Sequence, residues 1–188
     1  MPDHFAILAQ PRRPWLDDEA LKEAFHRATA QQHPDVAGDS GENASALNAA
    51  YAVLRDPAAR LRHWLELEAP EYLQARPDVP STFVETFGKL AALHQKVAAW
   101  EKACSTMGAL ARALGIGDRA ALVNEVEVWL TVLREAEARD LAGLSEINAR
   151  WELRDPLVPS LLAVQQQSFA LRAKWQALLR EDLFRLGA

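Results

Sequence analysis

Large apolar residues recur at every third or fourth position through most of the second half of this 188-residue chain. The longest such series comprises Phe83, Phe87, Leu90, Leu93, Val97, Trp100, Cys104, Met107, Leu110 and Leu114. This spacing places apolar side chains on one face of an α-helix, whereas a half-buried strand alternates at every second residue. Because Ala, Leu, Glu and Arg dominate and alternating β-branched runs are absent, we predict an all-α fold.

Further periodic segments follow the Gly-Ile-Gly-Asp stretch at 115–118, which ends the first helix and caps the next. One segment contains Leu122, Val126, Trp129 and Leu133, and the last extends from Leu161 to Leu186. A separate helical piece is expected around residues 144–151, before the prolines at 156 and 159. Three long amphipathic segments joined by short breaks predict a C-terminal three-helix bundle of antiparallel helices.

Shorter helical segments are predicted in the first third of the chain. A short helix over about residues 4–9 places Phe5 and Leu8 one turn apart. A longer helix begins at Asp17 or Asp18, buries a stripe that includes Leu21, and ends before Pro34. A third helix and a fourth meet at Asp56-Pro57, a cap followed by proline at the first helical position.

The prolines at 70, 77 and 80 mark a domain boundary. We therefore predict an N-terminal domain over residues 1–68, a linker over 69–80, and the helical bundle over 81–188.

The charge and composition exclude several classes of partner. The net charge is −5 and no long basic run exists, which argues against nucleic acid or an anionic membrane as the main partner. No stretch of about 18 uncharged apolar residues is present to span a bilayer. The N-terminus resembles neither a signal peptide nor a transit peptide, and a lone Cys104 cannot form an internal disulfide. A cytoplasmic location is therefore expected.

The tripeptide His33-Pro34-Asp35 has four possible roles: a catalytic pair, part of a metal site, a plain turn, or a contact surface. Catalysis would need a nucleophile, and no nucleophile motif accompanies the pair, so no enzyme activity is predicted. A zinc ion would need three or four ligands at suitable spacing. His26 and His33 are seven positions apart and the other histidines are scattered, so neither a metal nor another cofactor is expected.

The surroundings of this tripeptide favour a contact surface. Phe5 and Leu8 stand in the first helix, Lys22 and Arg27 lie on the outer face of the second, and a third helix carries a longer pattern. That pattern consists of Asn48, Ala50, Tyr51, Val53, Leu54, Asp56, Pro57 and Arg60. Together these features, over residues 3–66, resemble the J-domain, in which two antiparallel helices form a hairpin with His-Pro-Asp at its tip.

The resemblance implies a co-chaperone that binds an Hsp70-family chaperone and stimulates its ATPase. It assigns Hsp70 binding to His33, Pro34 and Asp35, together with Lys22, His26 and Arg27 on the preceding helix. His26 and Val36 stand where many J-domains carry a basic residue, so we expect weak binding to a general Hsp70 and a dedicated partner.

The second half of the chain narrows the resemblance. An all-helical region that lacks a Gly/Phe-rich linker and zinc-binding cysteine repeats is similar to the HscB/Jac1 type of J-domain protein. That similarity implies a client, an iron–sulfur cluster scaffold protein, bound by apolar and acidic residues on the first bundle helix. The matching residues here are Phe83, Val84, Glu85 and Phe87, with Gly88 in place of a second acid. An adaptor whose bundle binds an unrelated client is the alternative.

Overall fold

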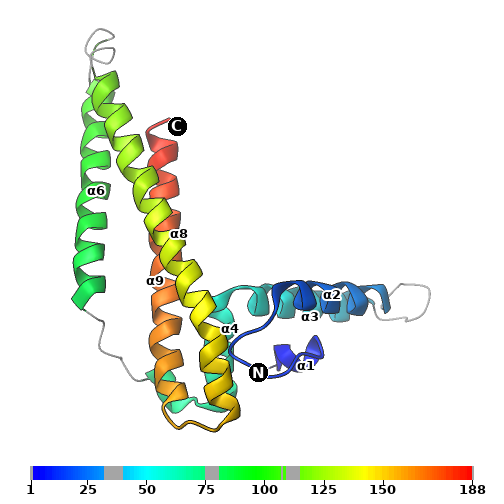
Figure 1. The fold of residues 1–188 in the computed structure, drawn as a ribbon. Coiled ribbons are helices and arrows are strands. Elements are labelled where there is room, and N and C mark those ends of the chain that lie inside the picture. Colours follow the sequence, from blue (N-terminus) through cyan, green and yellow to red (C-terminus); the bar gives the residue numbers. More distant parts are fainter. Residues whose placement is uncertain (1, 32–39, 75–80, 107, 109–114, 188) are drawn as a thin grey trace. The chain divides into compact units, whose positions relative to one another are not determined.

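The computed structural model describes residues 2–31, 40–74, 81–106, 108 and 115–187, and within these ranges it contains helices and no strand (Figure 1). The predicted all-α fold is confirmed. The helices are α1 (His4–Ile7), α2 (Asp18–Gln31), α3 (Ser40–Arg55), α4 (Pro57–Glu68), α5 (Glu71–Gln74), α6 (Ser81–Thr106), α8 (Ile116–Glu152) and α9 (Val158–Arg185).

The helices form two compact units, and α8 and α9 contribute residues to both. The first unit comprises Met1–Pro77 and Asp140–Phe169, and the second comprises Asp78–Arg139 and Ala170–Ala188. These units group the chain by spatial contact. The division into domains at 1–68 and 81–188 stays a prediction.

Two predicted helix boundaries are wrong. The first helix ends at Ile7 rather than near residue 9. The separate helical piece expected at 144–151 is the end of α8, which is continuous from Ile116 to Glu152. No proline interrupts that range, and strong helix formers fill it, so the backbone has no reason to break where the apolar periodicity fades.

The first unit has an apolar core that joins α1–α4 to the end of α8 and the start of α9. Trp64 is fully buried in it and meets Trp151 edge to face, with ring centroids 4.8 Å apart. Phe25 of α2 stacks on Tyr51 of α3 at a centroid distance of 4.4 Å. These contacts hold α2 and α3 side by side as the predicted helical hairpin.

The Asp56-Pro57 sequence starts α4 as expected, and Arg60 then ties the junction together. The Asp56 carboxylate accepts a hydrogen bond of 2.7 Å from the Ala59 N–H. Arg60 is only 2% exposed, and its guanidinium donates to the carbonyl oxygens of Pro14 and Leu54 at 3.1 and 2.8 Å. Arg60 thus fixes the segment before α2 to the end of α3.

The second unit packs α6 against the first part of α8 and the last part of α9. Its core consists of Leu90, Leu93, Val97, Val126, Leu130, Leu133, Leu179 and Leu186, in agreement with the predicted helical stripes. His94 of α6 contacts the fully buried Asp182 of α9 at 2.9 Å. Of the predicted α6 stripe, Met107, Leu110 and Leu114 lie outside the described residues.

We predict that Arg60→Met lowers the free energy of unfolding by about 2–4 kcal/mol, because two buried carbonyl groups lose their donors. Arg62→Met is the matched control. Arg62 is exposed, and among the described residues it pairs with Glu66 alone, one turn away, so its loss should cost below about 0.5 kcal/mol. Urea unfolding curves check both values, and equal effects would contradict a structural role for Arg60.

Candidate functional site

Helix α2 presents the three basic residues that the sequence assigns to a binding surface. The Asp17 carboxylate caps the helix by accepting a 2.8 Å hydrogen bond from the Ala20 N–H. Leu21 and Ala24 are buried toward α3, and this fixes the rotation of the helix about its axis. Lys22, His26 and Arg27 are consequently exposed.

Lys22 lies on the flank of α2 that faces α3. It lines a shallow cavity of about 390 Å³ together with Tyr51 and Arg55 of α3. The Arg55 guanidinium lies 5.7 Å from the centre of the Tyr51 ring, a cation–π contact that holds this arginine beside Lys22. Glu19 approaches the Lys22 ammonium at 3.7 Å, a loose surface pair that holds neither side chain firmly.

Arg27 lies on the opposite flank of α2. It lines a second shallow cavity, of about 420 Å³, with Ile7, Leu8 and Gln10 from α1 and the turn after it. His26 is exposed, and its ring centroid lies 5.7 Å from that of Phe25. The structure therefore distributes the predicted basic strip over two flanks of the helix.

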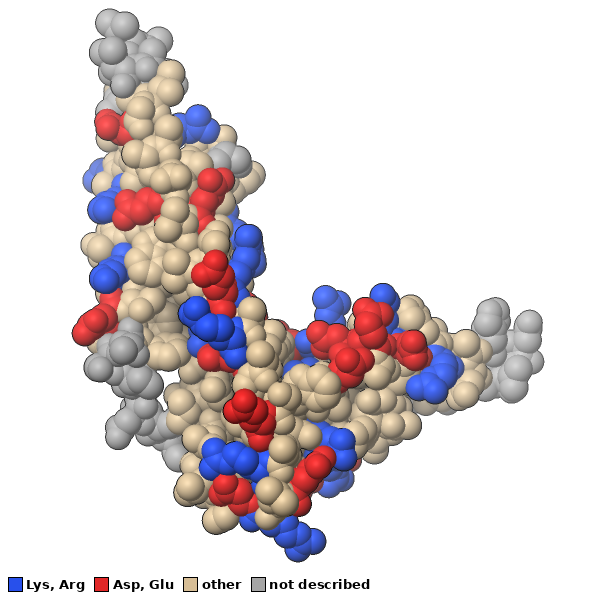
Figure 2. All heavy atoms as spheres, in the orientation of Figure 1, with Lys and Arg blue, Asp and Glu red and all other residues tan. Residues whose placement is uncertain are grey.

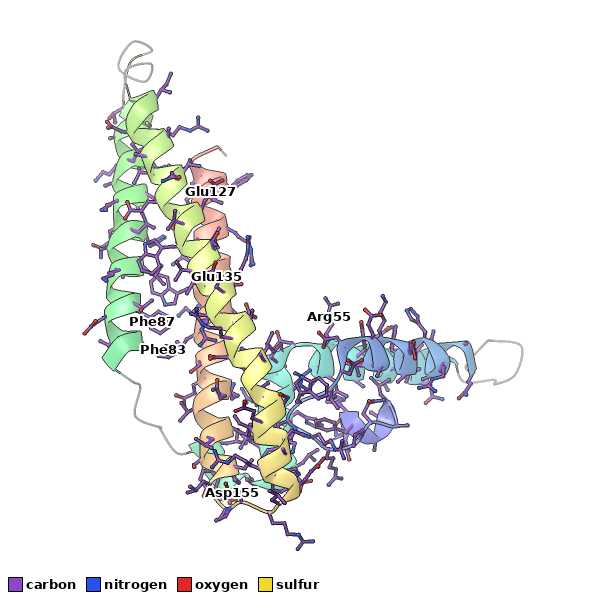
Figure 3. The ribbon with its side chains drawn as sticks, in the orientation of Figure 1. Arg55, Phe83, Phe87, Glu127, Glu135 and Asp155 are labelled. Carbon is purple, nitrogen blue, oxygen red and sulfur yellow. The ribbon has the colours of Figure 1, made fainter. Side chains whose placement is uncertain are left out.

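Two further observations concern this surface. His33, Pro34 and Asp35, which follow α2 in the sequence, lie outside the described residues. Arg55 was not singled out in the sequence, and its position beside Lys22 adds a cation to the same flank (Figure 3). The only available signal was the spacing of four between Tyr51 and Arg55, which places both on one face of α3.

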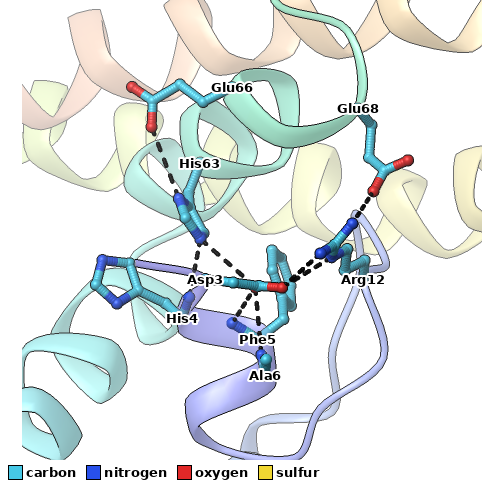
Figure 4. Close-up of polar contacts among 8 residues, drawn as sticks. All are labelled: Asp3, His4, Phe5, Ala6, Arg12, His63, Glu66 and Glu68. Atoms are coloured by element: carbon cyan, nitrogen blue, oxygen red, sulfur yellow. Dashed lines mark hydrogen bonds and ion pairs between the residues drawn. The ribbon is translucent and has the colours of Figure 1, made fainter. Parts of the chain in front are cut away.

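A polar network attaches the short helix α1 to α4 (Figure 4). The Asp3 carboxylate caps α1 by accepting hydrogen bonds from the N–H groups of Phe5 and Ala6 at 3.0 and 3.2 Å. The His4 N–H donates to Nε2 of the buried His63 at 3.1 Å. Arg12 bridges Asp3 and Glu68 at 2.7 and 3.0 Å.

The network shifts the pKa of both Asp3 and His4. Burial tends to raise the pKa of Asp3, but hydrogen bonds from Arg12 and from the N–H groups of Ala6 and Phe5 lower it overall. Burial is the main cause that lowers the pKa of His4, and the neighbouring His63 lowers it further. The folded state therefore favours an ionised Asp3 and a neutral His4.

The four predicted client-binding residues at the start of α6 fall into two pairs. Phe83 and Phe87 are half-buried and pack on α9, where Arg172 lies 5.4 Å from the Phe83 ring centre and Trp175 stacks on Phe87 at 5.9 Å (Figure 3). Val84 is 62% exposed, and Glu85 is exposed as well. The second pair alone offers side chains that a partner could reach without displacing helix contacts.

The described residues also bear on two other kinds of site, a metal site and a membrane span. Among the described residues, no group of three or more His, Cys, Asp or Glu side chains is placed to hold a metal ion. None of the helices that the structure describes has the length and apolar character needed to cross a membrane.

Comparisons with known proteins find similarity to J-domain co-chaperones. No protein-family model matches it. It is 38% identical over 52 residues to the J-type co-chaperone JAC1 (mitochondrial) of Saccharomyces cerevisiae, a match that covers 28% of each chain. It is 39% identical over 72 residues to the co-chaperone protein HscB homolog of Paraburkholderia phymatum, covering 34% of this chain and 41% of that relative. The chain thus spans less than half the length of these curated relatives.

A solved structure matches over nearly the full length. The chaperone HscB from Vibrio cholerae superposes with a TM-score of 0.56 at 18% identity, covering 98% of this chain and 99% of that one. The predicted fold, an N-terminal J-domain followed by a C-terminal helical domain, is confirmed. Each of the relatives named above is described as a chaperone or co-chaperone, in line with the prediction that the chain is not an enzyme.

The shifted pKa of His4 predicts how stability depends on pH. The unfolded chain binds a proton at His4 near pH 6.5, whereas the folded chain resists protonation there, so the unfolding free energy falls as pH decreases through 6.5. Asp3, whose pKa is lowered in the folded chain, reduces the unfolding free energy further only as pH falls below about 3.8. We expect His4→Gln to show a smaller decrease between pH 7.5 and 5 in urea unfolding.

His26→Gln removes an exposed imidazole and controls for the loss of a histidine as such. If wild type and His4→Gln lose stability equally over this range, the assignment of the effect to His4 is wrong.

Proposed function

We propose that the chain is a J-domain protein of the HscB/Jac1 type, which binds an Hsp70-family chaperone and stimulates its ATPase. The observation that carries this proposal is the exposed face of α2, which bears Lys22, His26 and Arg27 directly before His33-Pro34-Asp35 in the sequence. The chain supplies no catalytic group in this scheme. It favours one conformational state of its partner by binding that state more tightly.

The charge on α2 suggests a selective partner. Asp18, Glu19 and Glu23 outnumber Lys22 and Arg27, so the helix carries no excess of positive charge. Figure 2 shows acidic and basic side chains interspersed on the face of α2 and α3 that it presents. Because rim charges act mainly on the association rate, this surface should be attracted only weakly to an acidic partner. Contacts at close range must then distinguish the correct Hsp70 from other Hsp70 proteins, as expected for a dedicated partner.

For the client we propose an iron–sulfur cluster scaffold protein, bound at the start of α6. Val84 and Glu85 support this role, since an exposed valine beside an exposed acid matches the apolar and acidic contacts expected there. Phe83 and Phe87 are assigned a supporting role, because they join α6 to α9 and so position the exposed pair.

The alternative of an unrelated client is favoured by one observation. Gly88 replaces the second acid of the expected pattern, and nothing lies within 4 Å of the position where a side chain would begin. The exposed surface one turn beyond Val84 therefore has no side chain at position 88 with which a partner could form a contact. A protein that binds a smaller patch than an iron–sulfur scaffold would fit it equally well.

The Hsp70 proposal predicts the effect of changing the tripeptide. His33→Gln should abolish stimulation of the partner's steady-state ATPase while leaving helicity and thermal stability unchanged, because the imidazole is assigned to partner binding rather than to folding. Lys22→Glu should weaken stimulation chiefly at low salt, where charge attraction is least screened. Arg134→Glu, an exposed change on α8 in the second unit, is the control for added negative charge. Full stimulation by His33→Gln would refute the assignment of this site.

The client proposal predicts different outcomes for the two pairs on α6. Val84→Asp and Glu85→Lys should weaken binding of the scaffold, measured by calorimetry, without changing the melting temperature. Phe87→Ala should instead lower the free energy of unfolding by about 1–3 kcal/mol, because it removes a half-buried ring from the contact with Trp175. Scaffold binding that is normal in both Val84→Asp and Glu85→Lys would exclude this face.

A further inference from the structure

The turn between α8 and α9 holds an arginine in a backbone conformation that usually favours glycine. Arg154 has a φ of 56°. Its N–H donates to the Trp151 carbonyl at 2.9 Å, and the Asp155 N–H donates to the Arg150 carbonyl at 3.1 Å. This pair of bonds defines a Schellman motif, in which glycine is the commonest residue at the left-handed position. An arginine is strained there, and such strain is often found at functional positions.

The surrounding residues hold this conformation in place. Arg150 donates from Nε to the Asp155 carboxylate at 2.8 Å, and the Leu157 N–H donates to the other oxygen of the same carboxylate at 2.9 Å. These bonds also keep the pKa of Asp155 below its usual range, the Leu157 bond being the larger cause. The turn would therefore keep its shape with glycine at position 154, so the arginine side chain is not needed to form it.

The turn exposes one cation between two large apolar side chains. Leu153 is 83% exposed and Leu157 is 59% exposed. Arg154 is exposed too, and it forms no ion pair with any residue that the structure describes. Exposed leucines are common singly, but two that flank a strained, unpaired arginine form a surface with both apolar and cationic character.

A cavity of about 600 Å³ adjoins this turn within the first unit and is lined in part by Asp155, which Figure 3 labels. Its walls include Trp151 and Pro156 and the arginines at positions 12, 13 and 154. Arg12 is paired with Asp3 and Glu68, and Arg13 with Glu152 at 2.9 Å. Of these three arginines, Arg154 is thus the cation that keeps its full hydrogen-bonding capacity for a ligand.

We propose that this turn and its cavity, the Arg154 surface, bind an acidic peptide segment of a partner protein. A carboxylate of the segment forms a charge-assisted pair with the Arg154 guanidinium, while apolar side chains next to it cover Leu153 and the Trp151 wall. A small inorganic anion would leave the leucines exposed. Because Glu152 and Asp155 also line the cavity, its one arginine without an ion pair among the described residues can accept a single carboxylate of a peptide but not the densely charged backbone of a nucleic acid or an anionic lipid surface.

The Arg154 surface shares no residue with the α2 face or with the exposed pair on α6. The inference therefore stands apart from the proposed function, and loss of binding here should leave ATPase stimulation unchanged.

The test uses the full chain and fluorescein-labelled heptapeptides in a polarisation assay. The probe peptide alternates Glu and Leu, and the matched control alternates Gln and Leu. The wild type should bind the Glu/Leu peptide at least about tenfold more tightly than the Gln/Leu peptide, the difference expected for one charge-assisted hydrogen bond. Arg154→Gly should remove that preference and leave the melting temperature unchanged or raised, since glycine relieves the strained φ.

Two further variants test the apolar part. Leu153→Ser should weaken binding of the Glu/Leu peptide, whereas Ile116→Ser, a control at 60% exposure in the second unit, should not. Three results would overturn the proposal: no binding by the wild type at about 1 mM peptide, equal affinity of wild type and Arg154→Gly, or a lowered melting temperature in Arg154→Gly. Binding to phosphatidylserine vesicles that depends on Arg154, without peptide binding, would also overturn it.

Discussion

The buried guanidinium of Arg60 is the interaction on which the first unit depends. It binds the carbonyl of Pro14 before α2 and that of Leu54 near the end of α3, and it stands on α4. Burial lowers its pKa, although Asp18 and Asp56 oppose the shift. Since an uncompensated buried charge is costly, the three segments cannot separate without exposing both carbonyls and the cation together. This anchor fixes the segment that leads into α2, and the buried stripe of Leu21 and Ala24 then decides that Lys22 and Arg27 face outward.

Local chemistry predicted most of the helices, and it failed where one helix serves two cores. Asp17 and Asp56 cap their helices as their sequence context indicates. The continuity of α8 was missed because Leu133 belongs to the core of the second unit and Leu144 to that of the first, with Leu141 as the one large apolar residue between them. Leu133 and Leu144 are about three helical turns apart and so share one face. Helix propensity, rather than apolar periodicity, was the reliable signal there.

The candidate site was predictable only as far as it depends on a single helix. The outward position of Lys22, His26 and Arg27 follows from the buried stripe on α2. The contribution of Arg55 cannot be predicted from that stripe, because Arg55 lies on α3 and reaches the site only through the contact between α2 and α3. The inward position of Phe83 and Phe87 likewise depends on Arg172 and Trp175, which lie far along the chain on α9. Whether an apolar pair on one helix is buried or exposed cannot be predicted until the neighbouring helices are known.

The distribution of charge on the α2 face also limits how this face can recognise a partner. Lys22 and Arg55 lie on one flank of α2 and Arg27 on the other, while Asp18, Glu19 and Glu23 share the same helix. Opposite charges this close together cancel at distances beyond the Debye length of about 8 Å, so long-range attraction is weak. At contact, however, cations on different flanks of α2 touch different parts of the partner surface. Each cation forms an ion pair only if the partner places a carboxylate opposite that flank. Recognition by such a face depends on shape and register more than on net charge, which agrees with the proposal that the chain serves one Hsp70 rather than many.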